Sequence, residues 1–227
     1  MDGEKTMETA TTKTYTETED RIFRAALKIF SRKGKDGARM QAIADEAGIN
    51  KAMLHYYFRS KDRLYREVFR YVFHRAIGTF GHTMREGTTF EQVLRLCIDG
   101  YIDFVYTSPD LISLFLGELR EGGPVFREMV QEIIRDVEDA PPRILMEWIV
   151  GAARAGEIRP VDPLQTTITL FSSCIFVFFA FPVIQVLGGR ELDLEAFVEE
   201  RKKHVFDVMF HGLKPREGSE SDPQQAN

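Results

Sequence analysis

Apolar residues recur three or four positions apart through most of the chain, which is the spacing of one face of an α-helix. The first such stripe consists of Ile22, Ala25, Ala26, Ile29 and Phe30. No run of residues alternates with the period of two that a half-buried strand requires. The pattern therefore predicts an all-α protein of about nine to ten helices.

Glycine after helix ends and proline at helix starts divide this pattern into elements. The predicted helices span residues 17–33, 40–47, 51–58, 61–82, 90–106, 109–120, 124–139, 142–155, 163–187 and 194–213. Thr16 and Glu19 are placed to form a capping box, and Asn50 and Ser60 are suited to N-cap positions. Residues 1–15 and 214–227 are polar, so we expect both ends to be disordered.

Charge is distributed unevenly along the chain. Residues 18–75 hold 14 Lys and Arg against 7 Asp and Glu, a balance of +7, whereas residues 76–227 hold 14 against 24, a balance of −10. A basic N-terminal third on an otherwise acidic chain indicates an anionic partner that binds at one end only.

Residues 39–58 have the layout of a helix-turn-helix. Two short helices are joined by a turn that contains Gly48, which permits a left-handed backbone. Ile43 on the first helix can pack against Leu54 and Phe58 on the second. In this motif the second helix enters the major groove of DNA.

The outward side of the second short helix carries groups that suit DNA. Asn50, Ala52 and Met53 lie at its N-terminal end, where an amide can bind a base or phosphate and apolar groups can touch a thymine methyl. Lys61 begins the next helix, where it and the backbone amides can clamp a phosphate. The predicted DNA-binding residues are Arg39, Gln41, Asn50, Lys51, Ala52, Met53, His55, Tyr56 and Lys61.

At these residues the chain resembles the tetracycline-repressor (TetR) family of bacterial transcription regulators. The resemblance covers about residues 16–73 and lies in RKG at the end of the first helix, in IADEAGINKAMLHYYF and in RSKDRLY. It implies a three-helix DNA-binding domain over residues 16–76 and a helical ligand-binding and dimerisation domain over residues 77–213. Arg39, Asn50, Met53 and the His55–Tyr56 pair depart from the usual family pattern, so a relative's operator sequence does not transfer.

The predicted helix over residues 163–187 contains no charged residue and holds five phenylalanines. A helix that is apolar all round is either buried on every side or spans a membrane. Polar residues interrupt it and its flanks are not strongly basic, so we favour a soluble helix. With the last helix it would form the four-helix interface of a homodimer, as the resemblance implies. The predicted interface residues are Phe176, Phe179, Val198, Val205, Phe206 and Met209.

An effector pocket is expected between the central helices, about residues 90–187. The abundance of Phe and Met favours an apolar or aromatic effector. Each candidate lining residue also suits a plain core position, which is the commoner role. The candidates are Phe104, Leu111, Phe115, Met146, Trp148, Phe171 and Phe178.

The sequence gives little support for an enzyme or a metal-binding protein. No nucleophile elbow, phosphate loop or dinucleotide fingerprint is present, and no Cys/His cluster has zinc spacing. Glu118 and Glu121 could form an acid–base pair, but we expect both to be solvated. Two cysteines and no apolar leader favour a reducing cytoplasm.

The sequence thus predicts a cytoplasmic, homodimeric regulator without cofactor, metal or enzymatic activity. We expect a repressor that a small molecule releases from a palindromic operator. The alternatives are a helical small-molecule-binding protein or enzyme that does not bind DNA, and a membrane-bound sensor.

Overall fold

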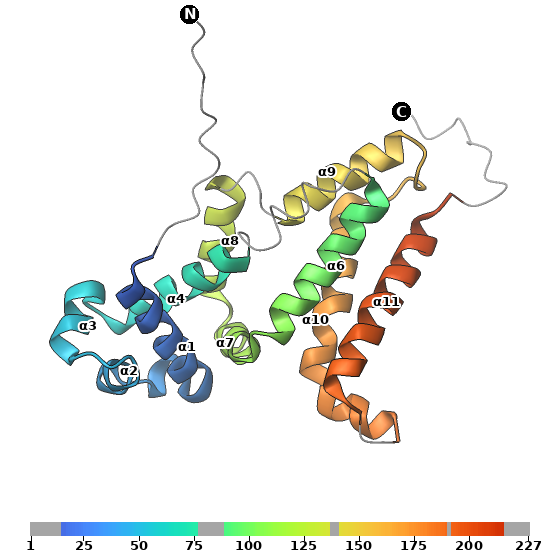
Figure 1. Ribbon diagram of the computed structural model, residues 1–227. Coiled ribbons are helices and arrows are strands. Elements are labelled where there is room, and N and C mark those ends of the chain that lie inside the picture. The colour runs from blue at the N-terminus through green and yellow to red at the C-terminus, as the bar shows by residue number, and fades with distance from the viewer. Residues whose placement is uncertain (1–14, 77–88, 137–140, 190–191, 216–227) are drawn as a thin grey trace, which may run out of the picture. The chain divides into compact units, whose positions relative to one another are not determined.

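A computed structural model describes residues 15–76, 89–136, 141–189 and 192–215 (Figure 1). All regular structure in these ranges is α-helical, which confirms the predicted fold class. The helices are α1 (Glu17–Gly37), α2 (Met40–Glu46), α3 (Lys51–Phe58), α4 (Lys61–Ala76), α6 (Phe90–Tyr106), α7 (Pro109–Arg120), α8 (Pro124–Asp136), α9 (Pro141–Arg154), α10 (Pro163–Leu187) and α11 (Leu194–Leu213). The predicted continuations over residues 77–82 and 137–139, and most of both polar ends, lie outside the described residues.

Local signals explain where the first helices begin and end. Thr16 Oγ1 accepts a hydrogen bond from the Glu19 amide (3.2 Å), and the Glu19 carboxylate accepts one from the Thr16 amide (2.9 Å), so the predicted capping box is present. The Ser60 hydroxyl accepts from the Arg63 amide at the start of α4 (3.2 Å). Gly34 takes a φ of 66° and interrupts α1 one residue after its predicted end, although helical turns continue to Gly37.

The described helices form two compact units. One comprises residues 1–79 and 107–140 and contains α1 to α4 with α7 and α8; the other comprises residues 80–106 and 141–227 and contains α6, α9, α10 and α11. The sequence had placed α7 and α8 in the C-terminal domain, but α7 packs on α1 and α8 packs on α4. These are units of packing; the division into DNA-binding and ligand-binding domains stays a prediction.

The first unit is built on the apolar stripe of α1. Phe23 is buried between Phe58 and Tyr71, with ring centroids 5.3 Å and 4.9 Å away. The whole stripe predicted for α1 is buried, which confirms the amphipathic pattern. This packing joins α1 to both α3 and α4.

In the second unit, α6 packs against α9, α10 and α11. Its buried face includes Cys97, and α10 contributes Cys174 to the same core. Burial among apolar groups raises the pKa of the Cys174 thiol to about 12, so this thiol stays protonated and unreactive at neutral pH. α10 and α11 run side by side (Figure 1).

Candidate nucleic-acid interface

α2 and α3 are held in a helix-turn-helix by their buried faces and by a tight turn. Ile43, Ala44 and Leu54 have no exposed surface. In the turn, Gly48 takes a φ of 65°, and the amide of Ile49 donates to the Ala44 carbonyl at 3.0 Å. The packing predicted from the sequence is therefore present, and it fixes α3 relative to α2.

The outward face of α3 is available to a partner. Lys51, Ala52 and His55 are exposed, and the exposed fractions of Met53 and Tyr56 are 42% and 82%. The interface role predicted for them is consistent with these positions.

Gln41, Asn50 and Lys61, three of the predicted DNA-binding residues, donate or accept hydrogen bonds within the first unit. Asn50 is the N-cap of α3, and its Oδ1 accepts from the Met53 amide at 2.7 Å, so only its Nδ2 group is left for DNA. Gln41 Nε2 donates to Asp45 Oδ1 at 2.7 Å. Lys61 is half-buried, and its Nζ donates to the carbonyls of Asp36 (3.0 Å) and Ala38 (3.3 Å). The ammonium of Lys61 therefore connects α4 to the segment that precedes α2.

Ion pairs attach the motif to the helices around it. Lys28 on α1 pairs with Glu46 on α2, and Lys35 on α1 pairs with Asp62 on α4 at 3.0 Å. Both carboxylates reach solvent, so water and salt screen these pairs. They connect α2 and α4 to α1 in addition to the buried apolar packing.

α4 is also attached to α8. The Arg70 guanidinium donates to both carboxylate oxygens of Glu132, at 2.8 Å and 2.6 Å, and these bonds hold the pKa of Glu132 below its usual value. Arg66 pairs with Glu128 one turn earlier, at 3.5 Å. A bidentate arginine–carboxylate pair fixes orientation more strongly than a single contact does.

Other cations around α3 have no such partner. Arg39, Lys51, Arg59 and Arg63 are exposed and form no ion pair within the described parts of the chain. Carboxylates neutralise Lys28, Lys35 and Arg70 but not these four, so four unneutralised cations lie in or beside the helix-turn-helix.

An exposed helix in a helix-turn-helix, surrounded by unpaired cations, defines a DNA-binding protein of the helix-turn-helix class. Comparison with known proteins agrees. Residues 22–68 match the sequence model of the family described as "Bacterial regulatory proteins, tetR family". The HTH-type transcriptional regulator RutR of Escherichia coli strain K12 is 25% identical over 198 residues, which cover 86% of this chain and 90% of RutR.

Solved structures show the same fold. The transcriptional regulator FadR from Bacillus subtilis, in complex with stearoyl-CoA, superposes with a TM-score of 0.68 at 18% identity and covers 86% of this chain and 99% of its own. The fatty acid degradation regulator FadR from Bacillus halodurans gives a TM-score of 0.69 at 21% identity. The match covers 90% of this chain and 100% of that regulator. Residues 22–68 thus form a TetR-type DNA-binding domain, and the chain is homologous to TetR-family transcriptional regulators.

The candidate pocket residues are divided between the two units. Leu111 and Phe115 belong to the first unit, whereas Phe104, Met146, Trp148, Phe171 and Phe178 belong to the second. The ring of Phe115 packs on Phe126 and that of Phe171 on Tyr101, each with centroids 4.7 Å apart.

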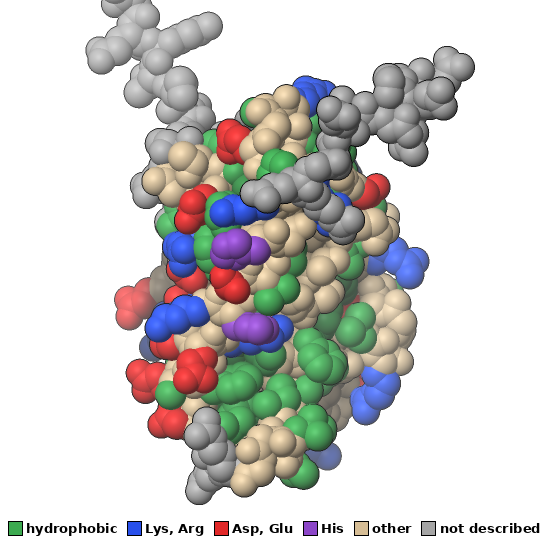
Figure 2. All heavy atoms as spheres, turned by 90° about the vertical axis from the view of Figure 1, so that its right-hand side faces the viewer, with side chains coloured by type: hydrophobic (Ala, Val, Ile, Leu, Met, Phe, Trp, Pro, Cys, Tyr) green, Lys and Arg blue, Asp and Glu red, His purple; other side chains and the backbone are tan. Residues whose placement is uncertain are grey.

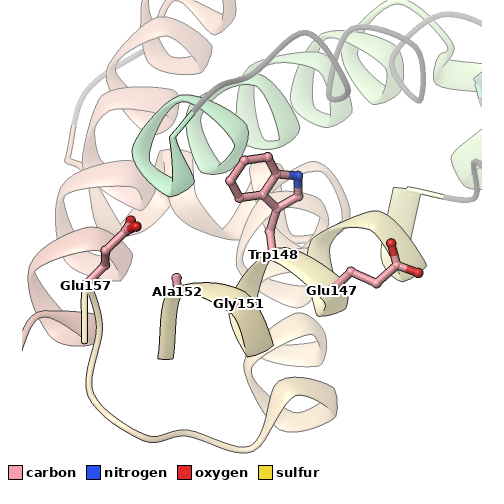
Figure 3. Close-up of a pocket in the computed structure, with 5 residues that line it drawn as sticks. All are labelled: Glu147, Trp148, Gly151, Ala152 and Glu157. Atoms are coloured by element: carbon pink, nitrogen blue, oxygen red, sulfur yellow. The ribbon is translucent and has the colours of Figure 1, made fainter. Parts of the chain in front are cut away.

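Trp148 lines a hollow in the described part of the second unit. The hollow measures about 290 Å³ and lies along α9, with Glu147, Gly151, Ala152 and Glu157 as its other lining residues (Figure 3). The side chains of Trp148, Glu147 and Glu157 point in different directions (Figure 3). No group of His, Cys, Asp and Glu side chains suited to a metal ion occurs among the described residues.

The six predicted interface residues divide into two groups. Phe176 is 62% exposed, and Phe179 and Met209 are half-buried. Val198, Val205 and Phe206 are buried inside the protomer; the Arg95 guanidinium on α6 lies 3.6 Å from the centroid of the Phe206 ring. These three residues therefore belong to the core between α6 and α11, because the apolar face of α11 is covered by α6 of the same protomer.

The exposed apolar residues of α10 include several that sequence reasoning missed. Together with Phe176, they are Leu164, Ile168, Val183, Val186 and Leu187, with exposed fractions between 49% and 81%. At 100° per residue they fall within one broad face of the helix. We call this set the α10 stripe. The sequence shows that α10 is apolar. Because it is apolar on all sides, however, the sequence does not show which face is exposed.

Glu118 contradicts the expectation of a solvated carboxylate. Only 1% of its surface is exposed. Its Oε1 accepts from the amides of Val125 (2.5 Å) and Phe126 (3.2 Å) at the start of α8, and its Oε2 accepts from the Tyr65 hydroxyl on α4 (3.2 Å). Glu121 is exposed as expected. Glu118 thus joins α4, α7 and α8, and nothing in the local sequence indicates this.

Proposed function

We propose that this regulator is a cytoplasmic homodimer that represses transcription from a palindromic operator and is released by a small apolar or aromatic effector. The observation that carries the DNA-binding part is the exposed face of α3, where unpaired Lys51 stands beside Met53 and the 82%-exposed Tyr56. Basic side chains suit phosphates, and apolar ones suit the thymine methyl groups of the major groove.

The homodimer is supported by the α10 stripe. A large exposed apolar stripe on a water-soluble protein marks an interaction surface. Figure 2 shows hydrophobic side chains gathered over the lower part of the face that it views. A two-fold dimer through α10 would present two copies of α3 to half-sites about one turn of DNA apart.

A membrane is the other environment that suits α10. Pro163–Leu187 is long and apolar enough to span one, and it is the only such helix in the described ranges. Within its unit, however, α10 packs on α6, α9 and α11, and its N-cap Asp162 accepts from the Gln165 amide. Because three helices already cover the other faces of α10, its exposed face suits a second copy of the protein better than lipid. We therefore propose no membrane partner.

The effector site is proposed for the second unit. The phenylalanines of α10 support an apolar or aromatic molecule, and the hollow along α9 offers the Trp148 indole beside two carboxylates. The solved complex of B. subtilis FadR with stearoyl-CoA shows that a protein of this fold accommodates an acyl ligand. Effector and operator must weaken each other's binding by the same factor. We propose no catalytic step for the protein.

Selection of bound sequences from a random duplex library, at near-physiological salt, tests the proposal. We expect a palindrome whose half-sites lie about one helical turn apart to be enriched over the non-specific background. The protein is then titrated with stearoyl-CoA and with apolar aromatic compounds in the presence of that duplex. Absence of any enriched sequence from the unliganded protein contradicts the proposed repression.

Replacing Lys61 with alanine is expected to weaken binding to every duplex rather than to one sequence. Removing one phosphate contact per protomer reduces the slope of log K against log salt by about 1.8 in a dimer. The midpoint of thermal unfolding should also fall, because the Asp36 and Ala38 carbonyls lose their donor. Lys203→Ala, an exposed cation on α11, is the matched control. A salt dependence equal to that of wild type would show that Lys61 acts only inside the fold.

A further inference from the structure

Arg59, between α3 and α4, has a backbone conformation that residues other than glycine rarely adopt. Its φ is 49° and its ψ is −40°, and it is the only non-glycine residue of positive φ in the described ranges. Its amide donates to the His55 carbonyl at 2.9 Å and so closes the last turn of α3. A glycine would adopt this conformation without repulsion between Cβ and the backbone. The arginine is therefore held here against its conformational preference.

The side chain of Arg59 contributes nothing to the described fold. It is exposed, and it makes no hydrogen bond, ion pair or ring contact with any described residue. Its neighbours differ, because Lys35 pairs with Asp62 and Lys61 donates to two carbonyls. The guanidinium is thus free to bind an anion outside the protein.

The position of Arg59 indicates which anion this is. Lys51, His55 and Arg59 recur every four residues and are all exposed. His55 Nδ1 lies 3.3 Å from the Arg59 carbonyl oxygen, which keeps the two residues adjacent. The nearest acidic residue in sequence, Asp62, is already paired with Lys35. Lys51 and Arg59 place two exposed cations at the two ends of α3, which match regularly spaced negative charges better than one isolated anion.

We propose that Arg59 binds a phosphate of double-stranded DNA at the C-terminal end of α3. This inference rests on the proposed DNA binding through α3, and adds a contact that the sequence analysis did not include. The strained backbone of Arg59 lowers the stability of the free protein. In the complex, the guanidinium that this conformation exposes binds a phosphate. Arg59 therefore lowers the folding stability of the protein and raises its affinity for DNA.

Three variants separate the charge from the backbone conformation. Arg59→Gly removes the charge and relieves the strain, Arg59→Ala removes the charge only, and Arg59→Lys keeps a charge. Each is measured for its thermal unfolding midpoint and for its Kd with fluorescein-labelled duplexes, one carrying the selected palindrome and one of random sequence, over a range of KCl concentrations. Arg127→Ala, an exposed cation of α8, serves as the matched control.

We expect the Gly and Ala variants to bind both duplexes about tenfold or more weakly at about 0.1 M salt, with a salt slope reduced by about 1.8 in the dimer. Arg59→Lys should retain most of the affinity, since a lysine also binds phosphate. Arg59→Gly should unfold at a higher temperature than Arg59→Ala, because only glycine accepts the positive φ.

Equal Kd and equal salt slope for wild type, Arg59→Gly and Arg59→Ala would overturn the phosphate contact while leaving DNA binding intact. A wild-type protein that binds neither duplex would instead overturn the proposed function. The two failures are therefore distinguishable in one set of titrations.

Discussion

Replacing Val183 with glutamate is expected to convert the protein from dimers into monomers. Val183 is 60% exposed in the protomer and lies within the α10 stripe, so a second copy would bury it. A two-fold interface would bury the new carboxylate twice, and an unpaired buried charge costs about 2–5 kcal/mol. The dimer Kd should therefore rise by at least about a thousandfold.

Light scattering and sedimentation give the oligomeric state, and circular dichroism checks that the helices remain. Operator affinity should fall with dimerisation, because one copy of α3 contacts only half of a palindrome. Leu116→Glu on α7 is the matched control, since Leu116 is 48% exposed but lies outside the stripe. Val183→Glu dimers as stable as wild type would remove α10 from the interface.

Val183 is a better position for this test than the buried residues of α11. A charge at Val205 or Phe206 would enter the protomer core beneath α6, because only 3% and 7% of their surfaces are exposed. Monomers obtained in that way would be partly unfolded, and their oligomeric state would say little about the interface.

Replacing Glu118 with alanine is expected to lower the free energy of unfolding by about 2–4 kcal/mol. The change leaves the amides of Val125 and Phe126 and the hydroxyl of Tyr65 without their acceptor in a buried site. A buried group that loses its partner costs about 1–3 kcal/mol, and because the three donors share one carboxylate the total is less than the sum of three separate losses. The loss should affect α8 and its contact with α4 first.

Urea denaturation followed by circular dichroism measures this effect. Glu118→Gln keeps one carbonyl acceptor and should lose roughly half as much, because an uncharged acceptor makes a weaker hydrogen bond. Glu121→Ala, one turn away and exposed, is the control and should lie within about 0.5 kcal/mol of wild type. A Glu118→Ala variant as stable as wild type would show that water can replace the carboxylate.

The residue spacing along the chain determined the helices and the helix-turn-helix. The bounds of α3, α6, α7, α10 and α11 agree with the prediction. Helix formation and capping depend on residues three or four positions apart, as in the Thr16–Glu19 box, so the information is local. The signature around Gly48 is local for the same reason and led directly to the TetR resemblance.

Only the tertiary structure decided which faces of those helices are used. α10 is apolar on all sides, so its sequence does not indicate which face the protomer leaves open. Glu118 resembles any surface glutamate until α4 and α8 are brought beside it, and Val205 and Phe206 suit a dimer interface until α6 covers them. Burial is a property of partners distant in sequence, whereas periodicity describes one helix at a time. The sequence therefore determined the elements and the DNA-binding motif, and long-range packing determined the buried network and the open surface.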